Sequence, residues 1–178
     1  MKVIINIDGG SRGNPGPGAS AYVIKTTDGK ILAQEGYFIL RCTNNQAEYT
    51  ALKLALIKSA ELGATELEII SDSLLLVKQY LGEYKIKNAD LAARMSEIRQ
   101  LAKPFQIQIR HVLRHLNKEP DALANKAMDL QQSVGFNPIQ NLQPDFAPDM
   151  VVNAVEVKPV TRTAKKINKN ANQPSLFD

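Results

Sequence analysis

The 178-residue sequence has a single cysteine and no apolar run long enough to cross a bilayer. One thiol excludes an internal disulfide bond and a zinc site built from several cysteines, and it fits a reducing compartment. Cys42 is therefore best explained as a small, partly buried residue. The apolar N-terminal residues reach Asp8 too soon for a signal peptide. We expect a soluble, cytoplasmic protein that has no membrane partner and is a monomer.

A strong charge bias is also missing. The chain has 22 Lys and Arg residues against 18 Asp and Glu residues, which gives a formal net charge of +4. This mild excess would help to hold a polyanion, but many proteins with the same balance never bind nucleic acid. The length allows one domain with a sizeable core and at most an appended segment.

The first part of the chain predicts an antiparallel meander. Residues Lys2–Asp8 alternate between the two faces of a strand, and we place Asp8 at its end. The glycines and prolines over Gly9–Gly18 predict a loop. Two further strands, Ala19–Thr26 and Lys30–Leu40, are joined by a short turn typical of a hairpin.

Helices and strands alternate in the next part. Asn44 or Asn45 can cap a helix that runs to about Leu62, and Gly63 is placed to end it. The remaining predicted elements, in chain order, are strand Leu67–Ser71, helix Ser73–Leu81, helix Asp90–Ala102, strand Phe105–Val112 and helix Lys118–Leu130. The last two strands are reached through helices, which predicts a mixed α/β sheet.

From about Gln131 the periodic pattern is lost, and prolines recur among Asn, Gln and Lys residues. We expect a folded domain over residues 1–130 and a largely disordered tail over residues 131–178. The charges of the tail are nearly balanced, so a purely electrostatic nucleic-acid arm is not expected.

Four carboxylates fall at positions where acids are costly. Glu48 shares a helical face with Leu52 and Leu56, so its side chain points at the core. A buried, unpaired carboxylate costs several kcal/mol unless a cation, a metal or a proton compensates it. Asp8 and Asp72 each end an apolar strand, and Asp121 opens the last helix. Each acid alone is more easily explained as a helix cap or strand-end residue, but the set favours a metal site.

Oxygen ligands without histidine or cysteine select hard ions, Mg²⁺ with Mn²⁺ as a substitute. Two such ions about 4 Å apart would suit in-line attack on a phosphodiester.

Two other features of the sequence give weaker evidence of function. The segment Gly13–Gly18 lacks the Lys-Ser/Thr ending of a P-loop. His111 is in step with Ile107 and Ile109 and is expected to be structural, whereas His115 precedes Asp121 and could shuttle protons.

Several stretches, in this order and spacing, resemble type 1 ribonuclease H over about residues 1–130. They are Asn6–Gly10 with Asn14–Ala19, Thr43–Tyr49, Ser71–Ser73 and Asn117–Asn125. The resemblance implies a five-stranded sheet with helices on both faces. It also implies two-metal endonucleolytic cleavage of the RNA strand of an RNA–DNA hybrid, leaving a 5′-phosphate and a 3′-hydroxyl.

The same resemblance assigns roles to residues. Asp8 would bridge both ions, Asp121 would help to hold the ion that activates water, and Glu48 and Asp72 would hold the ion on the leaving-group side. The residues implied to bind substrate through its backbone and minor groove, or to allow its close approach, are Gly9, Asn14, Asn44 and Asn45. Recognition should depend on the shape of the hybrid.

The sequence departs from the family in two places. Residues 82–89 lack the basic protrusion that some members use to grip the hybrid, and Lys85 and Lys87 are a reduced substitute. The stretch Arg114–Asn117 is compact and is similar to the branch without that protrusion, which also lacks the mobile catalytic histidine. Arg114 and His115 remain candidates for the site. Some members of this branch also cut RNA–DNA junctions or double-stranded RNA.

The tail ends in a peptide that resembles the motif with which bacterial replication and repair proteins bind the sliding clamp. Its matching residues are Gln173, Leu176 and Phe177, and it departs from the motif at Pro174. Two alternatives to the ribonuclease remain. One is a catalytically inactive ribonuclease-H-like binding or scaffold module, which the intact acids disfavour. The other is an integrase or 3′ exonuclease, which the run Asn44–Glu48 disfavours.

Overall fold

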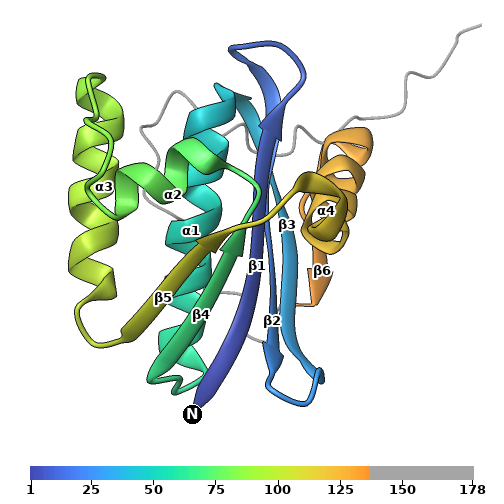
Figure 1. Ribbon diagram of the computed structural model, residues 1–178. Coiled ribbons are helices and arrows are strands. Elements are labelled where there is room, and N and C mark those ends of the chain that lie inside the picture. The colour runs from blue at the N-terminus through green and yellow to red at the C-terminus, as the bar shows by residue number, and fades with distance from the viewer. Residues whose placement is uncertain (137–178) are drawn as a thin grey trace, which may run out of the picture.

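In the computed structural model, which describes residues 1–136, six strands form one mixed sheet in the order β5-β4-β1-β2-β3-β6 (Figure 1). β1–β2 and β2–β3 pair antiparallel, whereas β1–β4 and β4–β5 pair parallel, as predicted. The strands are β1 (Lys2–Ser11), β2 (Gly16–Thr26), β3 (Ile31–Cys42), β4 (Glu66–Ser71), β5 (Gln106–His111) and β6 (Val134–Phe136).

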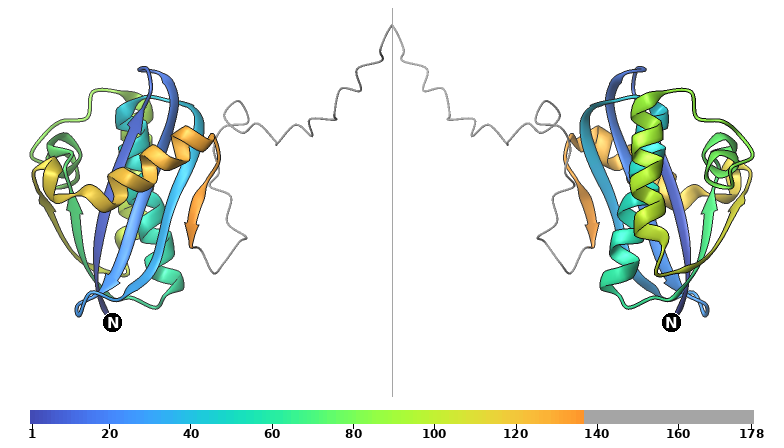
Figure 2. Two further views of the ribbon diagram at one scale, coloured as in Figure 1. Left: turned by 90° about the vertical axis from the view of Figure 1, so that its right-hand side faces the viewer. Right: turned by 90° about the vertical axis from the view of Figure 1, so that its left-hand side faces the viewer.

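Helices cover both faces of the sheet, which confirms that part of the prediction (Figure 2). They are α1 (Asn44–Glu61), α2 (Leu74–Tyr80), α3 (Ala89–Ala102) and α4 (Lys118–Leu130). The long helix α1 packs on β1 and β2, and α3 packs against α1, while α4 crosses the other face over β2 and β3. The main core lies under α1 and includes Ile5, Ile7, Leu52, Leu56 and Ile69.

None of the helices in residues 1–136 combines the length and the apolar character that crossing a bilayer requires.

The sheet has one strand more than the predicted five, because β6 pairs antiparallel with β3. Its middle residue is Gly135, whose backbone φ of 119° suits glycine alone. So short a strand has no alternating pattern that a sequence could display. β6 lies beyond residue 130, where we expected the folded domain to end, so the domain extends at least to Phe136. The rest of the predicted tail, with Gln173, Leu176 and Phe177, lies outside the described residues.

The predicted loop over Gly9–Gly18 is shorter than expected. β1 continues to Ser11, which pairs with Gly18 of β2, so Asp8 lies inside the strand rather than at its end. Glycine is required at Gly9, because a Cβ there would lie 2.4 Å from the backbone of Ala47 and Glu48 in α1. Gly9, which suggested a loop, thus marks a close approach within a strand.

The cap of α1 is also different from the prediction. Thr43, not Asn44 or Asn45, caps the helix: its Oγ1 accepts from the Gln46 N–H at 3.2 Å, and Gln46 Oε1 accepts from the Thr43 N–H at 2.9 Å. This reciprocal pair satisfies two backbone donors at the helix start. The side chains of both asparagines are therefore available for other contacts. Gly63, with φ of 68°, follows the end of the helix as predicted.

We expect Gly9→Ala to lower the free energy of unfolding by about 3 kcal/mol, because the new methyl group must displace the backbone of α1. Gly10→Ala is the matched control, since a Cβ at Gly10 meets nothing within 4 Å. That change should stay within about 1 kcal/mol of the wild type. Urea unfolding of both variants measures the difference, and equal stabilities would contradict the close packing of β1 on α1.

Candidate active site: a carboxylate cluster

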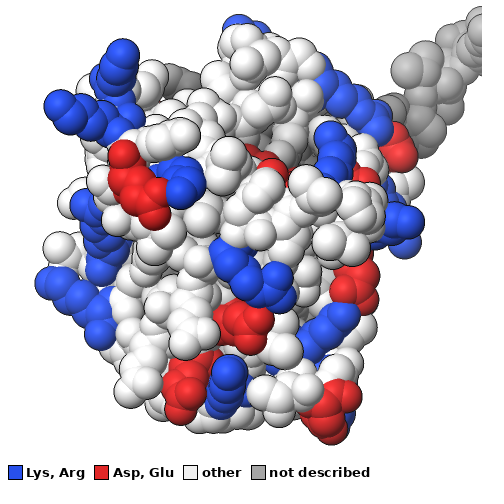
Figure 3. Space-filling model, viewed as in Figure 1, with Lys and Arg blue, Asp and Glu red and all other residues white. Residues whose placement is uncertain are grey.

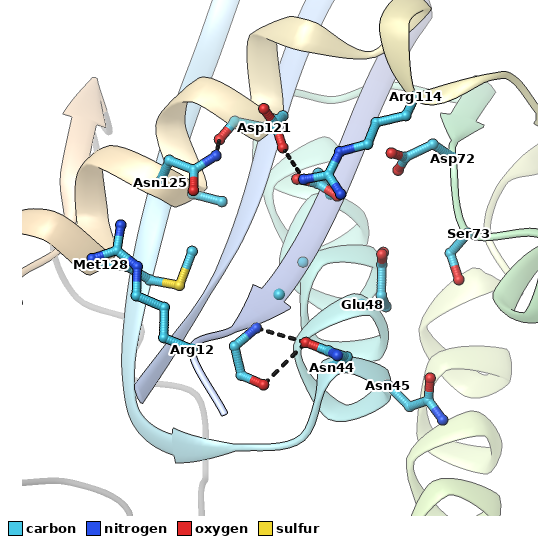
Figure 4. Close-up of a pocket in the computed structure, with 15 residues that line it drawn as sticks. Arg12, Asn44, Asn45, Glu48, Asp72, Ser73, Arg114, Asp121, Asn125 and Met128 are labelled. Carbon is cyan, nitrogen blue, oxygen red and sulfur yellow. Dashed lines mark hydrogen bonds and ion pairs between the residues drawn. The ribbon is translucent and has the colours of Figure 1, made fainter. Parts of the chain in front are cut away.

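Three carboxylates meet where β1, β4 and α1 come together. β1 and β4 are parallel neighbours with Ile7 opposite Ser71, so Asp8 and Asp72 follow side by side. The contact of Gly9 with α1 brings Glu48 to the same place. One carboxylate oxygen from each of Asp8, Glu48 and Asp72 lies within 4.8 Å of the others (Figure 4). The predicted meeting of acids from neighbouring strands therefore occurs.

The fourth predicted acid, Asp121, comes from the first turn of α4 on the other face of the sheet. It lines the same pocket, which has a volume of about 560 Å³. Its Oδ1 accepts a hydrogen bond from Arg114 Nη2 at 2.7 Å, and the two side chains form an ion pair (Figure 4). Asp121 is thus close to the cluster but is engaged by an arginine.

Burial and mutual repulsion dominate the electrostatics of the cluster. Burial, followed by the charges of Asp72 and Asp121, raises the pKa of Asp8 from 3.8 to about 7. Burial, followed by the charges of Asp8 and Asp72, raises the pKa of Glu48 well above its ordinary value. The charges of Asp72 and Asp121 act on Asp8, and those of Asp8 and Asp72 act on Glu48, so the acids of the cluster repel one another.

The donor set fits a divalent cation. Glu48 Oε2 is buried and has no hydrogen-bond partner, although the residue as a whole is only half-buried. A buried carboxylate oxygen without a donor is costly, and a cation would satisfy it. In residues 1–136, neither histidine nor cysteine joins the cluster, so its ligands are oxygen atoms alone. Such ligands suit Mg²⁺ and Mn²⁺.

Asn117 links the parts of the site and was given no role from the sequence. It is 1% exposed. Its Nδ2 donates to the Ile7 carbonyl at 2.8 Å and to Asp72 Oδ1 at 3.3 Å, and its Oδ1 accepts from Asn6 Nδ2 at 3.0 Å. One amide therefore connects β1, the residue after β4 and the start of α4. The sequence signal for such a partner is Asn6, a polar residue on the same strand face as Asp8, whose amide needs a hydrogen-bond partner; that partner is Asn117.

The predicted substrate-binding residues surround the opening of the pocket. Gly9, Asn44 and Asn45 line it. Asn44 Oδ1 accepts from the Ser11 N–H at 2.8 Å (Figure 4). Asn14 Oδ1 accepts from the Asn44 N–H at 3.1 Å. Asn14 is exposed and supports this wall without lining the pocket. The loop after β1 and the start of α1 are thus tied together beside the acids.

The remaining candidates divide between the pocket and the surface. Arg114 lines the pocket, and its side chain is 76% exposed. His115 is exposed and lies outside the pocket, and Lys85 and Lys87 are exposed between α2 and α3, also outside it. His111 is exposed at the end of β5 and does not line the pocket, so the alternation of its strand does not give it a place in the core. Seven residues that line the pocket were not predicted from the sequence: Gly10, Ser11, Arg12, Ser73, Ala124, Asn125 and Met128.

Charge alone does not mark this face as a nucleic-acid surface. Figure 3 shows acidic and basic side chains mixed over one face of the molecule, without a continuous basic area. Specific geometry in the pocket is therefore a better guide to function than the net charge.

Comparison with known proteins identifies the family. Residues 6–127 match the reverse-transcriptase-like family. The bifunctional protein Rv2228c of Mycobacterium tuberculosis is 44% identical over 131 residues, which cover 72% of this chain and 36% of that protein. Ribonuclease HI of Halobacterium salinarum is 45% identical over 123 residues, or 68% of this chain and 62% of that protein. The chain thus matches about a third of the length of the mycobacterial relative.

Solved structures give the same result. The N-terminal RNase H domain of Rv2228c superimposes with a TM-score of 0.71 at 43% identity, covering 73% of this chain and 95% of that chain. LC11-RNase H1, isolated from compost, was solved in complex with an RNA/DNA hybrid and gives a TM-score of 0.69 at 35% identity, covering 72% of this chain and 98% of that chain. The chain therefore belongs to the type 1 ribonuclease H group of the reverse-transcriptase-like family.

We expect the metal-free protein to lose stability as the pH rises from about 4 to about 7. The folded-state pKa of Asp8 is raised from 3.8 to about 7, so the folded state binds more protons than the unfolded state in this window. Asp8→Asn should remove this dependence in part and stabilise the protein at pH 8 by roughly 2–4 kcal/mol.

Urea unfolding in EDTA at pH 5 and pH 8 measures this effect. Glu66→Gln is the control, because it removes one negative charge from an exposed residue outside the pocket. A rise in wild-type stability between pH 5 and pH 8, or an equal gain from both variants, would contradict the assignment of the repulsion to the cluster.

Proposed function

We propose that this protein is an endoribonuclease that hydrolyses the RNA strand of RNA–DNA hybrids by two-metal-ion catalysis, leaving 5′-phosphate and 3′-hydroxyl ends. The observation that carries the proposal is the convergence of Asp8, Glu48 and Asp72 in an open pocket, with a buried Glu48 oxygen that lacks a partner. The complex of LC11-RNase H1 with an RNA/DNA hybrid supports the choice of substrate.

The four carboxylates would hold the ions. Asp8 would bridge the two ions, since it lies on the strand beside Asp72 and shares the cluster with Glu48. Glu48 and Asp72 would complete the ligands on the leaving-group side, and Asp121 those on the water side. Bound Mg²⁺, or Mn²⁺ in its place, lowers the pKa of water and stabilises the negative charge that develops on the phosphate. Before the ions bind, burial and mutual repulsion raise the pKa of Asp8 and of Glu48, which favours the neutral form of each carboxyl group.

Other residues of the pocket would position the hybrid. Asn44 and Asn45 present amide groups at the pocket opening, and Asn14 fixes the wall behind them. Amides can contact sugar and phosphate atoms without reading bases, which suits recognition by shape. Glu48 would lie near the 2′-hydroxyl that distinguishes RNA from DNA. Arg114 at the pocket edge supplies a cation for a phosphate.

The alternative function is a catalytically inactive binding module. It is disfavoured because the three converging acids are intact, and a binding surface for a polyanion gains nothing from buried negative charge. We propose that the protein acts as a monomer in the cytoplasm, where the buried thiol of Cys42 would stay reduced.

The test offers labelled RNA–DNA hybrid, double-stranded RNA, single-stranded RNA and a DNA duplex with one ribonucleotide, each with Mg²⁺, Mn²⁺ or EDTA. We expect cleavage of the hybrid that EDTA abolishes. Asp8→Asn should lower the rate by at least about a thousandfold, because it removes the bridging ligand. Glu66→Gln should cleave like the wild type. Cleavage in EDTA, or an undiminished rate for Asp8→Asn, would overturn the mechanism.

We also propose that Gln173, Leu176 and Phe177 bind the sliding clamp. A tethered peptide that ends in an apolar pair suits a hydrophobic pocket on a partner. The full chain should retain purified clamp in a pull-down, and a chain lacking residues 173–178 should not. The double variant Leu176→Ala and Phe177→Ala is the matched control for loss of the apolar pair alone. Equal recovery with all three proteins would refute this proposal and leave the ribonuclease untouched.

A further inference from the structure

A second hollow continues the acid pocket around the first turn of α4. We call it the outer groove, and its lining residues are Leu113, Arg114, His115, Lys118, Asp121 and Ala122. Arg114 and Asp121 line both the outer groove and the acid pocket, so the two hollows adjoin at this ion pair.

Backbone hydrogen bonds fix the segment that carries Leu113, an exposed apolar residue of this groove. Leu113 is 61% exposed. On either side of it, the Val112 N–H donates to the Ser71 carbonyl at 2.9 Å, and the Asn117 N–H donates to the Arg114 carbonyl at 3.0 Å. The Leu116 N–H donates to the Leu113 carbonyl itself at 2.8 Å. An exposed leucine is common on protein surfaces, but this one is fixed at the edge of a candidate active site.

The chemistry of the groove matches a nucleic-acid strand. Leu113 and Ala122 offer apolar surface to a sugar or to the face of a base, and Arg114 and Lys118 bring positive charge to the same hollow. Arg114 has five N–H donors. One bond to Asp121 leaves its exposed guanidinium able to contact a phosphate as well. Apolar and cationic groups together suit a sugar-phosphate chain better than either would alone.

We propose that the outer groove is a subsite for the strand that crosses the carboxylates. It holds the nucleotides that adjoin the cleavage position, with a sugar or base against Leu113 and phosphates beside Arg114 and Lys118. The shared Arg114 and Asp121 carry this step, because a polymer bound over the acids must leave the acid pocket along one of its walls and the outer groove adjoins this wall. The inference rests on the proposed function for the identity of that strand.

Photo-crosslinking tests the position of the strand without requiring cleavage. Cys42 is the single cysteine of the chain and is 2% exposed, so it should not react with a thiol label. Leu113→Cys adds an exposed thiol to which a benzophenone can be attached. In an Asp8→Asn background, the labelled protein should crosslink to an RNA–DNA hybrid. Leu130→Cys is the matched control, because Leu130 is 51% exposed at the far end of α4 and lines neither hollow. Crosslinking of Leu113→Cys no stronger than that of Leu130→Cys would overturn the proposal.

Kinetics give an independent readout. Leu113→Ser should lower kcat/KM about fivefold on long hybrids through the loss of one apolar contact. The loss should disappear on hybrids trimmed so that they end at the acid pocket. Leu130→Ser should match the wild type at every length, and circular dichroism melts should show that both variants fold.

The possible failures can be told apart. If the wild type leaves hybrids uncut, the proposed function is refuted. The crosslinking experiment then still shows whether a hybrid binds in the outer groove. A wild type that cuts hybrids, with Leu113→Ser equal to Leu130→Ser at every length, refutes the groove alone.

Discussion

The repulsion among buried carboxylates is the constraint on which the rest of the structure depends. Parallel pairing of β1 with β4 places Asp8 beside Asp72, and the close packing of α1 on Gly9 adds Glu48. Such charges oppose folding. The free energy gained by burying apolar side chains offsets this repulsion. Fully buried residues on the same strands are Val3, Ile5, Ile7 and Ile69. A cation that binds the cluster in the folded state but not in the unfolded state would raise the free energy of unfolding.

The site also joins two layers of the protein. Asp8, Glu48 and Asp72 belong to the sheet and to α1, whereas Asp121 arrives on α4 from the opposite face. The contact of α4 with the sheet is made largely by small residues, among them Ala19, Ala21, Ala124 and Ala127. These allow close approach, and Asn117 fixes the start of the helix to β1 and to Asp72. The position of Asp121 therefore depends on one buried amide and on a tight, alanine-rich contact.

Much of this fold could be predicted from the sequence because its periodic patterns are strong. The bounds of α4 were predicted as the structure has them, and the antiparallel pairing of the first three strands and the mixed sheet followed from chain order and connection length. Glu48 on an apolar helical face was sufficient to suggest a charged site.

What the sequence did not reveal depends on contacts between distant residues. Gly9 resembles a loop residue until its contact with α1 is known, and β6 is too short to have a pattern. Thr43 was overlooked because two asparagines beside it are equally good caps by residue type. His111 follows the alternation of β5, but that strand is at the edge of the sheet, where alternation does not ensure burial. The ion pair of Arg114 with Asp121 links two segments whose geometry no local pattern sets.

The position of β6 has a consequence for how this fold combines with other protein segments. β6 pairs with β3 at the edge of the sheet, on the far side of β2 and β3 from β1, and it runs antiparallel to β3, away from the start of α1. Phe136 therefore lies toward the start of β3, whereas α1, which carries Glu48, follows the end of β3. A domain fused at this end of the fold would not have to cross the carboxylate cluster. The fold is in this sense a module suited to C-terminal fusion, and a bifunctional mycobacterial relative of which it matches 36% accords with that architecture.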